Sequence, residues 1–266
     1  MKKWALACAA LQLALFAQFA PAQANEEVKI GVLTDLSGPD SDMAGAGSVL
    51  AAQMAVEDAG GVAGGRKVDV ISADHQRKAD IASALASRWF DNENVDAILD
   101  VPLSSAGLAV QEVARQRSKV VMFSTSATSD LTGKACSPTG FHWTYDTTAV
   151  ANGTAAAVTK AGGKKWFFVA ADYAFGHALQ RDATAVIEKN GGQVIGNVRH
   201  PVAAADFASF LLQAQASKAD VVGLANSATD FINSVRQSNE FGLQQGGQKV
   251  AALLAFLTDI HSLAST

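Results

Sequence analysis

The feature of this sequence that most limits its fold is a regular alternation of short β-branched runs with longer helical stretches. Val28–Leu33 has the composition of a buried strand, and Ala46–Asp58 has that of an amphipathic helix. Further strands are predicted over Lys67–Ile71, Asp96–Asp100 and Lys119–Phe123, each preceded by a helix. Such alternation is typical of a parallel sheet covered by helices on both faces, so the predicted fold class is α/β.

The same order of elements begins again in the second half of the chain. Lys165–Ala170 is predicted to be a strand, and the helix after it closes on Lys189–Gly192 much as the first helix closes on Asp58–Gly61. Ala205–Ser209 likewise resembles Ala79–Ser83, and each is predicted to open a helix that leads to a strand. The alternative is the general likeness of any α/β chain to itself. A true repeat predicts two Rossmann-like lobes with parallel sheets.

The repeat also predicts the domain boundaries and the place of the site. We expect lobe 1 over residues 25–143 and lobe 2 over residues 144–266, with Phe141–Asp146 as the first crossing strand of a hinge. Ligands of parallel sheets bind beyond the carboxyl ends of the strands. The expected site is therefore a cleft between the lobes.

Residues 1–24 are predicted to be a signal peptide rather than part of the fold. Lys2 and Lys3 precede the apolar run Trp4–Ala20, and Ala22–Ala24 offers small residues for cleavage before Asn25. A membrane anchor is the alternative, but the run is short for a bilayer span. We therefore expect an exported protein with no membrane insertion after cleavage.

Charge, cysteine and histidine content exclude several classes of function. The formal net charge is −4 and becomes more negative by two when Lys2 and Lys3 are removed, which argues against nucleic acid or an anionic membrane as partner. Cys136 is the only cysteine after cleavage, and is either a free thiol or half of a bond whose partner is absent. The five histidines lack metal-ligand spacing, so no metal site and no cofactor are expected.

Five motifs in this order resemble the type I periplasmic binding proteins, in particular the branched-chain amino acid group that feeds ABC importers. The motifs are Ile30–Pro39, Ala55–Gly61, Phe123–Thr128, Asp172–Gly176 and Ser238–Leu243. The resemblance covers Val28 to Leu263. Within the group, Ala73–Gln76 and Phe141–Asp146 are most similar to members proposed to bind aromatic or other organic carboxylates.

The resemblance implies a periplasmic protein whose lobes close over a small carboxylate ligand and then dock on an ABC permease in the inner membrane. Proteins of this group are longer than 266 residues. We therefore expect the chain to stop within an incomplete second lobe, as a fragment or truncated product, with a partner of Cys136 further along.

Hydroxylic residues after two predicted strands of lobe 1 are candidate ligand contacts. Ser104 and Ser105 precede a helix predicted to begin near Ala106, where one could cap the helix and the other contact the ligand. By resemblance, Ser105 matches a ligand-contacting serine. Ser124, Ser126 and Thr128 lie in a run of small residues, and the last two match positions that hold the carboxylate in amino acid binders; a capping run is the alternative.

In lobe 2, Tyr173 and Phe175 lie between a strand and a helix, and Asn226 and Asp259 follow later strands. Such an aromatic residue is usually partly buried packing. The resemblance implies that Phe175 closes over the ligand, and its ring suits stacking on an apolar or aromatic one. Amino acid binders of the group pair the ligand ammonium with a glutamate near Asp259. Its absence here puts an amino acid ligand in doubt.

These observations predict the solute-binding component of an ABC importer, with no catalytic residues. A sensory ligand-binding module is one alternative, although the sequence offers no output segment. A serine hydrolase is another, using Ser124 or Ser105 with His75 or His142 and Asp74. No serine lies in a Gly-x-Ser-x-Gly elbow, and nothing in the sequence places a base beside a nucleophile.

Overall fold

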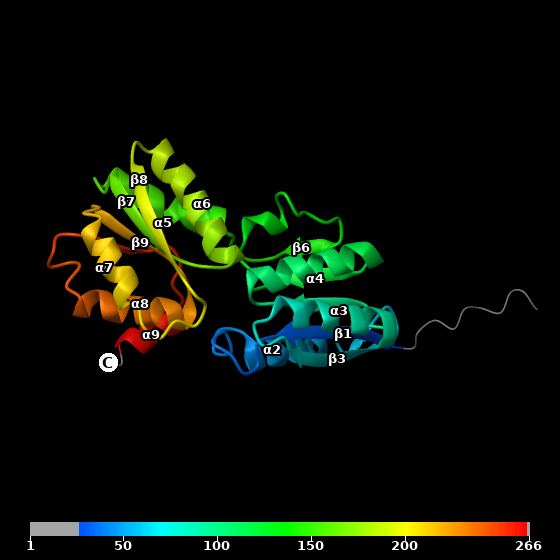
Figure 1. Ribbon diagram of the computed structural model, residues 1–266. Coiled ribbons are helices and arrows are strands. Elements are labelled where there is room, and N and C mark those ends of the chain that lie inside the picture. The colour runs from blue at the N-terminus through cyan, green and yellow to red at the C-terminus, as the bar shows by residue number, and fades with distance from the viewer. Residues whose placement is uncertain (1–26, 265–266) are drawn as a thin grey trace, which may run out of the picture.

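A computed structural model describes residues 27–264, which form two lobes (Figure 1). One lobe contains a six-stranded sheet and the other a four-stranded sheet. The predicted signal peptide lies outside the described residues. Among the helices of residues 27–264, none combines the length and the apolar character that a bilayer crossing requires.

The first sheet is formed by the N-terminal half of the chain. Its strands, in order across the sheet, are β2 (Val62–Ala63), β3 (Arg66–Asp74), β1 (Glu27–Thr34), β4 (Ala97–Asp100), β5 (Val120–Phe123) and β6 (Gly140–His142). The helices are α2 (Gly45–Asp58), α3 (Ala79–Asn92), α4 (Ser104–Arg117) and the short 3-10 helix η2 (Ser129–Leu131). β1 pairs in parallel with β3 and β4, whereas β2 runs antiparallel to β3. Gly64 and Gly65 form the intervening turn with φ of 58° and 79°, values that favour glycine.

The second sheet is formed by the C-terminal half. Its strands, in order, are β8 (Gln193–His200), β7 (Lys165–Ala171), β9 (Val221–Ala225) and β10 (Lys249–Ala252), all parallel. The helices are α5 (Thr147–Lys160), α6 (Ala174–Lys189), α7 (Ala208–Ala216), α8 (Ala228–Glu240) and α9 (Leu257–Ala264).

The two sheets share one topology, which confirms the predicted α/β fold class. In the first sheet the order β3-β1-β4-β5 places the first strand of the half in second position. In the second sheet the order β8-β7-β9-β10 does the same. The elements that the sequence pairs across the repeat therefore occupy equivalent places.

The central strand β7 shows why the second half forms a covered sheet. Trp166 and Phe168 are fully buried in a cluster with residues of α5 and α6. Their neighbours Phe167 and Val169 are buried in a second cluster with α7 and α8. Because successive side chains of a strand point to opposite faces, this pattern requires helices on both sides of the sheet.

The helix predicted to open within Ala205–Ser209 begins at Ala208, and the carboxylate of Asp206 accepts a hydrogen bond from the Ala208 amide at 2.8 Å. The crossing strand predicted over Phe141–Asp146 differs from the structure. Residues 140–142 form the edge strand β6 of the first sheet, and residues 143–146 then lead to α5 in the other lobe. Trp143 in this connection is 87% exposed.

Candidate ligand-binding site

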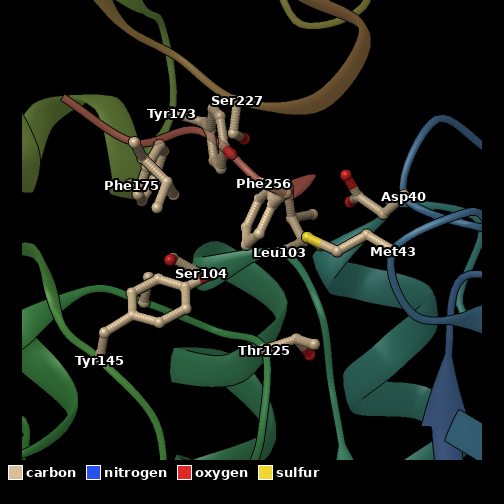
Figure 2. Close-up of a pocket in the computed structure, with 12 residues that line it drawn as sticks. Asp40, Met43, Leu103, Ser104, Thr125, Tyr145, Tyr173, Phe175, Ser227 and Phe256 are labelled. Atoms are coloured by element: carbon tan, nitrogen blue, oxygen red, sulfur yellow. The ribbon is translucent and has the colours of Figure 1, made fainter. Parts of the chain in front are cut away.

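A small cavity lies between the lobes, where the carboxyl ends of the two sheets face each other. Both lobes line it, and Figure 2 shows their side chains converging. The lining residues are Asp40, Met43, Leu103, Ser104, Thr125 and Ala127 from the first lobe, and Tyr145, Tyr173, Phe175, Ser227, Leu254 and Phe256 from the second. The cavity's volume of about 20 Å³ leaves room for little more than one water molecule in this conformation, so a larger ligand requires the lobes to move apart.

Three helices begin at the cavity without a side-chain cap. The residues that precede their first turns are Leu103 for α4, Tyr173 for α6 and Ser227 for α8, and none of the three side chains makes a capping hydrogen bond. The first amides of a helix lack intrahelical partners and carry partial positive charge. Their convergence makes the cavity favourable for an anion.

Aromatic rings form the wall contributed by the second lobe. The ring centroids of Tyr145 and Phe256 are 6.0 Å apart, and those of Tyr173 and Phe175 are 5.9 Å apart. Phe175 is 3% exposed and packs into the core that also holds Leu179. Rings fixed in this way offer flat apolar surfaces at little cost in conformational entropy.

A buried ion pair lies at the edge of the cavity. Nη1 of Arg77 is 3.1 Å from Oδ1 of Asp40, and the two side chains are only 10% and 5% exposed. Burial raises the pKa of Asp40 to about 6, although the Arg77 charge works against the rise. Arg77 also lies 5.8 Å from the ring centroid of Tyr173, so the pair connects the two lobes.

Comparison with known proteins agrees with this architecture. The family model described as periplasmic binding protein matches residues 27–266. A crystal structure of a periplasmic binding protein from Burkholderia mallei is 46% identical, with a TM-score of 0.88 over 90% of this chain. The chain belongs to the periplasmic binding protein family. A binding-protein family is also in keeping with the expectation that the chain is not an enzyme.

Two further solved structures are similar to this binding protein. A branched chain amino acid ABC transporter periplasmic ligand-binding protein from Burkholderia xenovorans is 37% identical, with a TM-score of 0.72 over 89% of this chain. The chain spans 63% of the length of each of the two Burkholderia proteins. A solute binding protein from R. palustris, solved with benzoate, shares the fold at 21% identity, with a TM-score of 0.75 over 84% of this chain and 61% of that one. No curated protein matches the chain.

Three of the residues predicted from the sequence line the cavity of this binding protein: Ser104, Tyr173 and Phe175. Ser104 is the first residue of α4, two positions earlier than the predicted helix start, and its Oγ accepts a hydrogen bond from the Thr128 amide at 3.2 Å. Ser105 is partly exposed and is not among the lining residues.

The hydroxylic run after β5 is largely engaged with its own lobe. Ser124 and Thr125 donate to Oδ1 of Asp100 at 2.7 and 2.6 Å, and Thr125 lines the cavity. Ser126 is buried and donates to the Val101 carbonyl at 2.5 Å. Thr128 is buried, and its Oγ1 accepts from the Asp130 amide at 3.3 Å, as the capping alternative expects.

Asn226 and Asp259 are both buried and lie behind the lining residues. Nδ2 of Asn226 is 3.2 Å from Nε2 of His200. Oδ2 of Asp259 accepts a hydrogen bond from the Phe256 amide at 2.9 Å, and burial raises the pKa of Asp259. Asp259 therefore supports the lining residue Phe256, whereas the hydrogen bonds of Asn226 reach no lining residue.

The residues that sequence reasoning missed come mostly from loops. Asp40 follows Gly38-Pro39, which was noted only as part of a motif, and Arg77 follows a motif at the end of β3. Ser227 adjoins the predicted Asn226. Phe256 precedes α9 and carries no local signal, since an aromatic residue before a helix is usually packing.

The structure also places the remaining candidates for special chemistry. Among the described residues there is no group of three or more histidine, cysteine or acidic side chains that could hold a metal. Cys136 is exposed and forms no disulfide with another described residue. Burial lowers the pKa values of His75 and His200, which favours their neutral forms.

Proposed function

We propose that this protein is the solute-binding component of an ABC importer and that its ligand is a small aromatic carboxylate. One observation carries the proposal: three uncapped helix N-termini and two pairs of aromatic rings meet in one cavity between the lobes. The helix termini suit the carboxylate, and the rings suit the aromatic body.

The carboxylate is best placed against the first lobe. The hydroxyl of Ser104 and the first amides of α4 lie at the cavity, next to Thr125. Neutral hydroxyl and amide donors can hold a carboxylate without a cationic side chain because the helix dipole adds to their effect. Ser105, Ser126 and Thr128 remain proposed contacts, which would require the start of α4 and the loop after β5 to adjust when the ligand enters.

An aromatic acid fits the second lobe better than an amino acid does. The ammonium of an amino acid would need an acidic partner near Asp259, but that carboxylate faces the Phe256 amide and lies outside the lining. The wall presents Tyr145, Phe175 and Phe256 instead. The benzoate-bound R. palustris protein shows that this fold can accept such a ligand.

The transport role rests on the family. Closure of two lobes over a ligand would present a new surface to an ABC permease in the inner membrane. The Burkholderia xenovorans relative carries the name of an ABC transporter ligand-binding protein, which supports this assignment.

The test is a binding screen on the protein expressed from Asn25 to its natural C-terminus. Melting temperatures are measured with benzoate, 4-hydroxybenzoate, aliphatic acids, leucine and valine, followed by calorimetric titration of every compound that stabilises. We expect aromatic acids to raise the melting temperature most, because a ligand that binds only the folded state stabilises it by mass action. Micromolar binding of leucine or valine with no response to aromatic acids would overturn the ligand class while leaving the transport role open.

A further inference from the structure

We propose that Asp40 is a specificity residue that selects aromatic acids bearing a hydrogen-bond donor, such as a hydroxyl group, at the end of the ring opposite the carboxylate. This inference rests on the proposed function and narrows its ligand class. It starts from the lining of the cavity, where Asp40 is the only one of 12 residues with a side chain charged near neutral pH.

The Asp40 carboxylate has one oxygen engaged and one free. Oδ1 accepts a hydrogen bond from Arg77 at 3.1 Å. No hydrogen bond to Oδ2 is formed among the described residues, and this oxygen is not one of their fully buried unpartnered atoms, so it lies at the surface of the cavity. Figure 2 shows the carboxylate directed toward the side of the cavity where Ser227 and Phe256 lie. An accessible carboxylate oxygen without a partner can accept a hydrogen bond from a donor on the ligand, and such charge-assisted bonds are among the stronger ones.

The loop that carries Asp40 is fixed by its own hydrogen bonds. The Asp40 amide donates to Oδ2 of Asp35 at 3.0 Å, and the Asp40 carbonyl accepts from the amides of Met43 and Ala44 at 3.1 and 2.9 Å. The free oxygen is therefore held in place before any ligand arrives. Such preorganisation favours discrimination between closely related ligands.

Asp40 lies apart from the proposed carboxylate position. It belongs to the loop after β1, whereas Ser104 follows β4, the neighbouring strand. Figure 2 shows the two side chains on opposite sides of the cavity. A benzene ring with substituents at opposite ends can bridge such a gap. An α-amino acid cannot, because its two charged groups are attached to one carbon.

A neutral donor suits the free oxygen of Asp40. Arg77 already pairs with the other oxygen of this carboxylate. A hydroxyl group would satisfy Oδ2 without adding charge. An unsubstituted ring would instead leave that oxygen desolvated and unpaired.

The experiment compares calorimetric dissociation constants for 4-hydroxybenzoate and 4-fluorobenzoate, which differ at the critical position in donor capacity more than in size. We expect the wild-type protein to prefer 4-hydroxybenzoate by roughly tenfold or more, the effect of one charge-assisted hydrogen bond. The variant Asp40→Leu with Arg77→Met replaces both partners by apolar residues, which avoids a lone buried charge. In it the ratio should fall to near one. Asp42→Asn, at an exposed position of the same loop, should keep the wild-type ratio.

Each outcome bears on the inference separately from the proposed function. Equal binding of the two acids by the wild-type protein, or a preference that persists in the double variant, would overturn the role of Asp40 and leave the aromatic-acid assignment standing. If neither acid binds the wild-type protein, both proposals fail. A circular dichroism melt of the double variant confirms that it is folded.

Discussion

The two lobes have the same strand order but contribute different chemistry to the cavity. The first lobe supplies Asp40, Ser104 and Thr125, whereas the second supplies mainly rings, among them Tyr145, Phe175 and Phe256. The strands determine where the lining residues stand, because the carboxyl ends of both sheets face the same space. The loops after them determine what the ligand meets. Changes in loops can therefore alter ligand choice while the scaffold is kept.

The largest effect on stability is expected at Gly176 in the second lobe, which directly follows Phe175 of the aromatic wall. A Cβ added at Gly176 would lie 2.1 Å from the Ala171 carbonyl oxygen, so Gly176→Ala must displace α6 from β7. We expect the free energy of unfolding to fall by more than about 3 kcal/mol. Urea denaturation measures it. Gly153→Ala, on the exposed face of α5 with no atom near the added Cβ, is the control and should be neutral or slightly stabilising.

The next largest effect is a dependence of stability on pH, caused by Asp40 in the first lobe. Because burial raises the pKa of Asp40 to about 6, the folded state binds the Asp40 proton more tightly than the unfolded state. The contribution of Asp40 to stability is then complete below its unfolded pKa and lost as the pH rises through about 6. By linkage the loss is of the order of 3 kcal/mol. Asp40→Asn has no proton to lose in this range and should not show this loss of stability.

The measurement is urea unfolding of the wild-type protein and Asp40→Asn at pH 4 and pH 7. The other charges near Asp40, on Arg77, Asp35, Asp100 and Asp230, are present in both proteins, so their direct contributions largely cancel in the comparison. The wild-type protein should lose more stability than the variant between the two pH values. Parallel stability curves would show that Asp40 does not titrate in this range.

A smaller effect is expected on ligand affinity when an aromatic ring is removed from the wall. Phe175→Leu keeps an apolar side chain but loses the ring, and should weaken benzoate binding by about 1.5 kcal/mol, or roughly tenfold. Phe141→Leu is the matched control, since Phe141 is 51% exposed and does not line the cavity. Calorimetry of both variants sharpens the contrast between the lobes. Equal losses of affinity in the two variants would show that the aromatic wall does not contact the ligand.

The smallest effect concerns the polar residue that the second lobe adds among its rings. Ser227 precedes α8, lines the cavity and makes no capping hydrogen bond. Ser227→Ala should weaken ligand binding by about 0.5–1 kcal/mol with little change in melting temperature. Ser209→Ala, on an exposed part of α7, serves as the control. A stability loss without an affinity change would assign Ser227 a structural role instead.

The fold could be predicted because its signals are local and repeated. Runs such as Val28–Leu33 and Lys165–Ala170 are mostly apolar strands, and Gly60-Gly61 and Gly191-Gly192 mark equivalent turns. These features predict the elements of each lobe and their repeat, whereas the order of the strands across each sheet comes from the structure. The β2–β3 hairpin was missed, because a strand of two exposed residues leaves no hydrophobic periodicity to detect.

The site could be predicted only in part, because its residues meet through tertiary structure. Ser104 and Phe175 were found because they directly follow strands, where parallel sheets place ligands. Asp40 and Arg77 lie 37 positions apart, and nothing in either local sequence indicates that they pair. The engagement of Ser126 with the Val101 carbonyl is equally invisible, since a serine after a strand can face either the ligand or its own lobe.

The most direct test of the central claim is a crystal structure of the protein with 3-bromo-4-hydroxybenzoate, using the anomalous signal of bromine to orient the ring. The account predicts one bromine peak inside the cavity between the lobes, near Asp40, with the carboxylate at Ser104 and the start of α4. A ligand bound outside this cavity, or one whose carboxylate points to Asp40 and whose bromine lies beside α4, would contradict it.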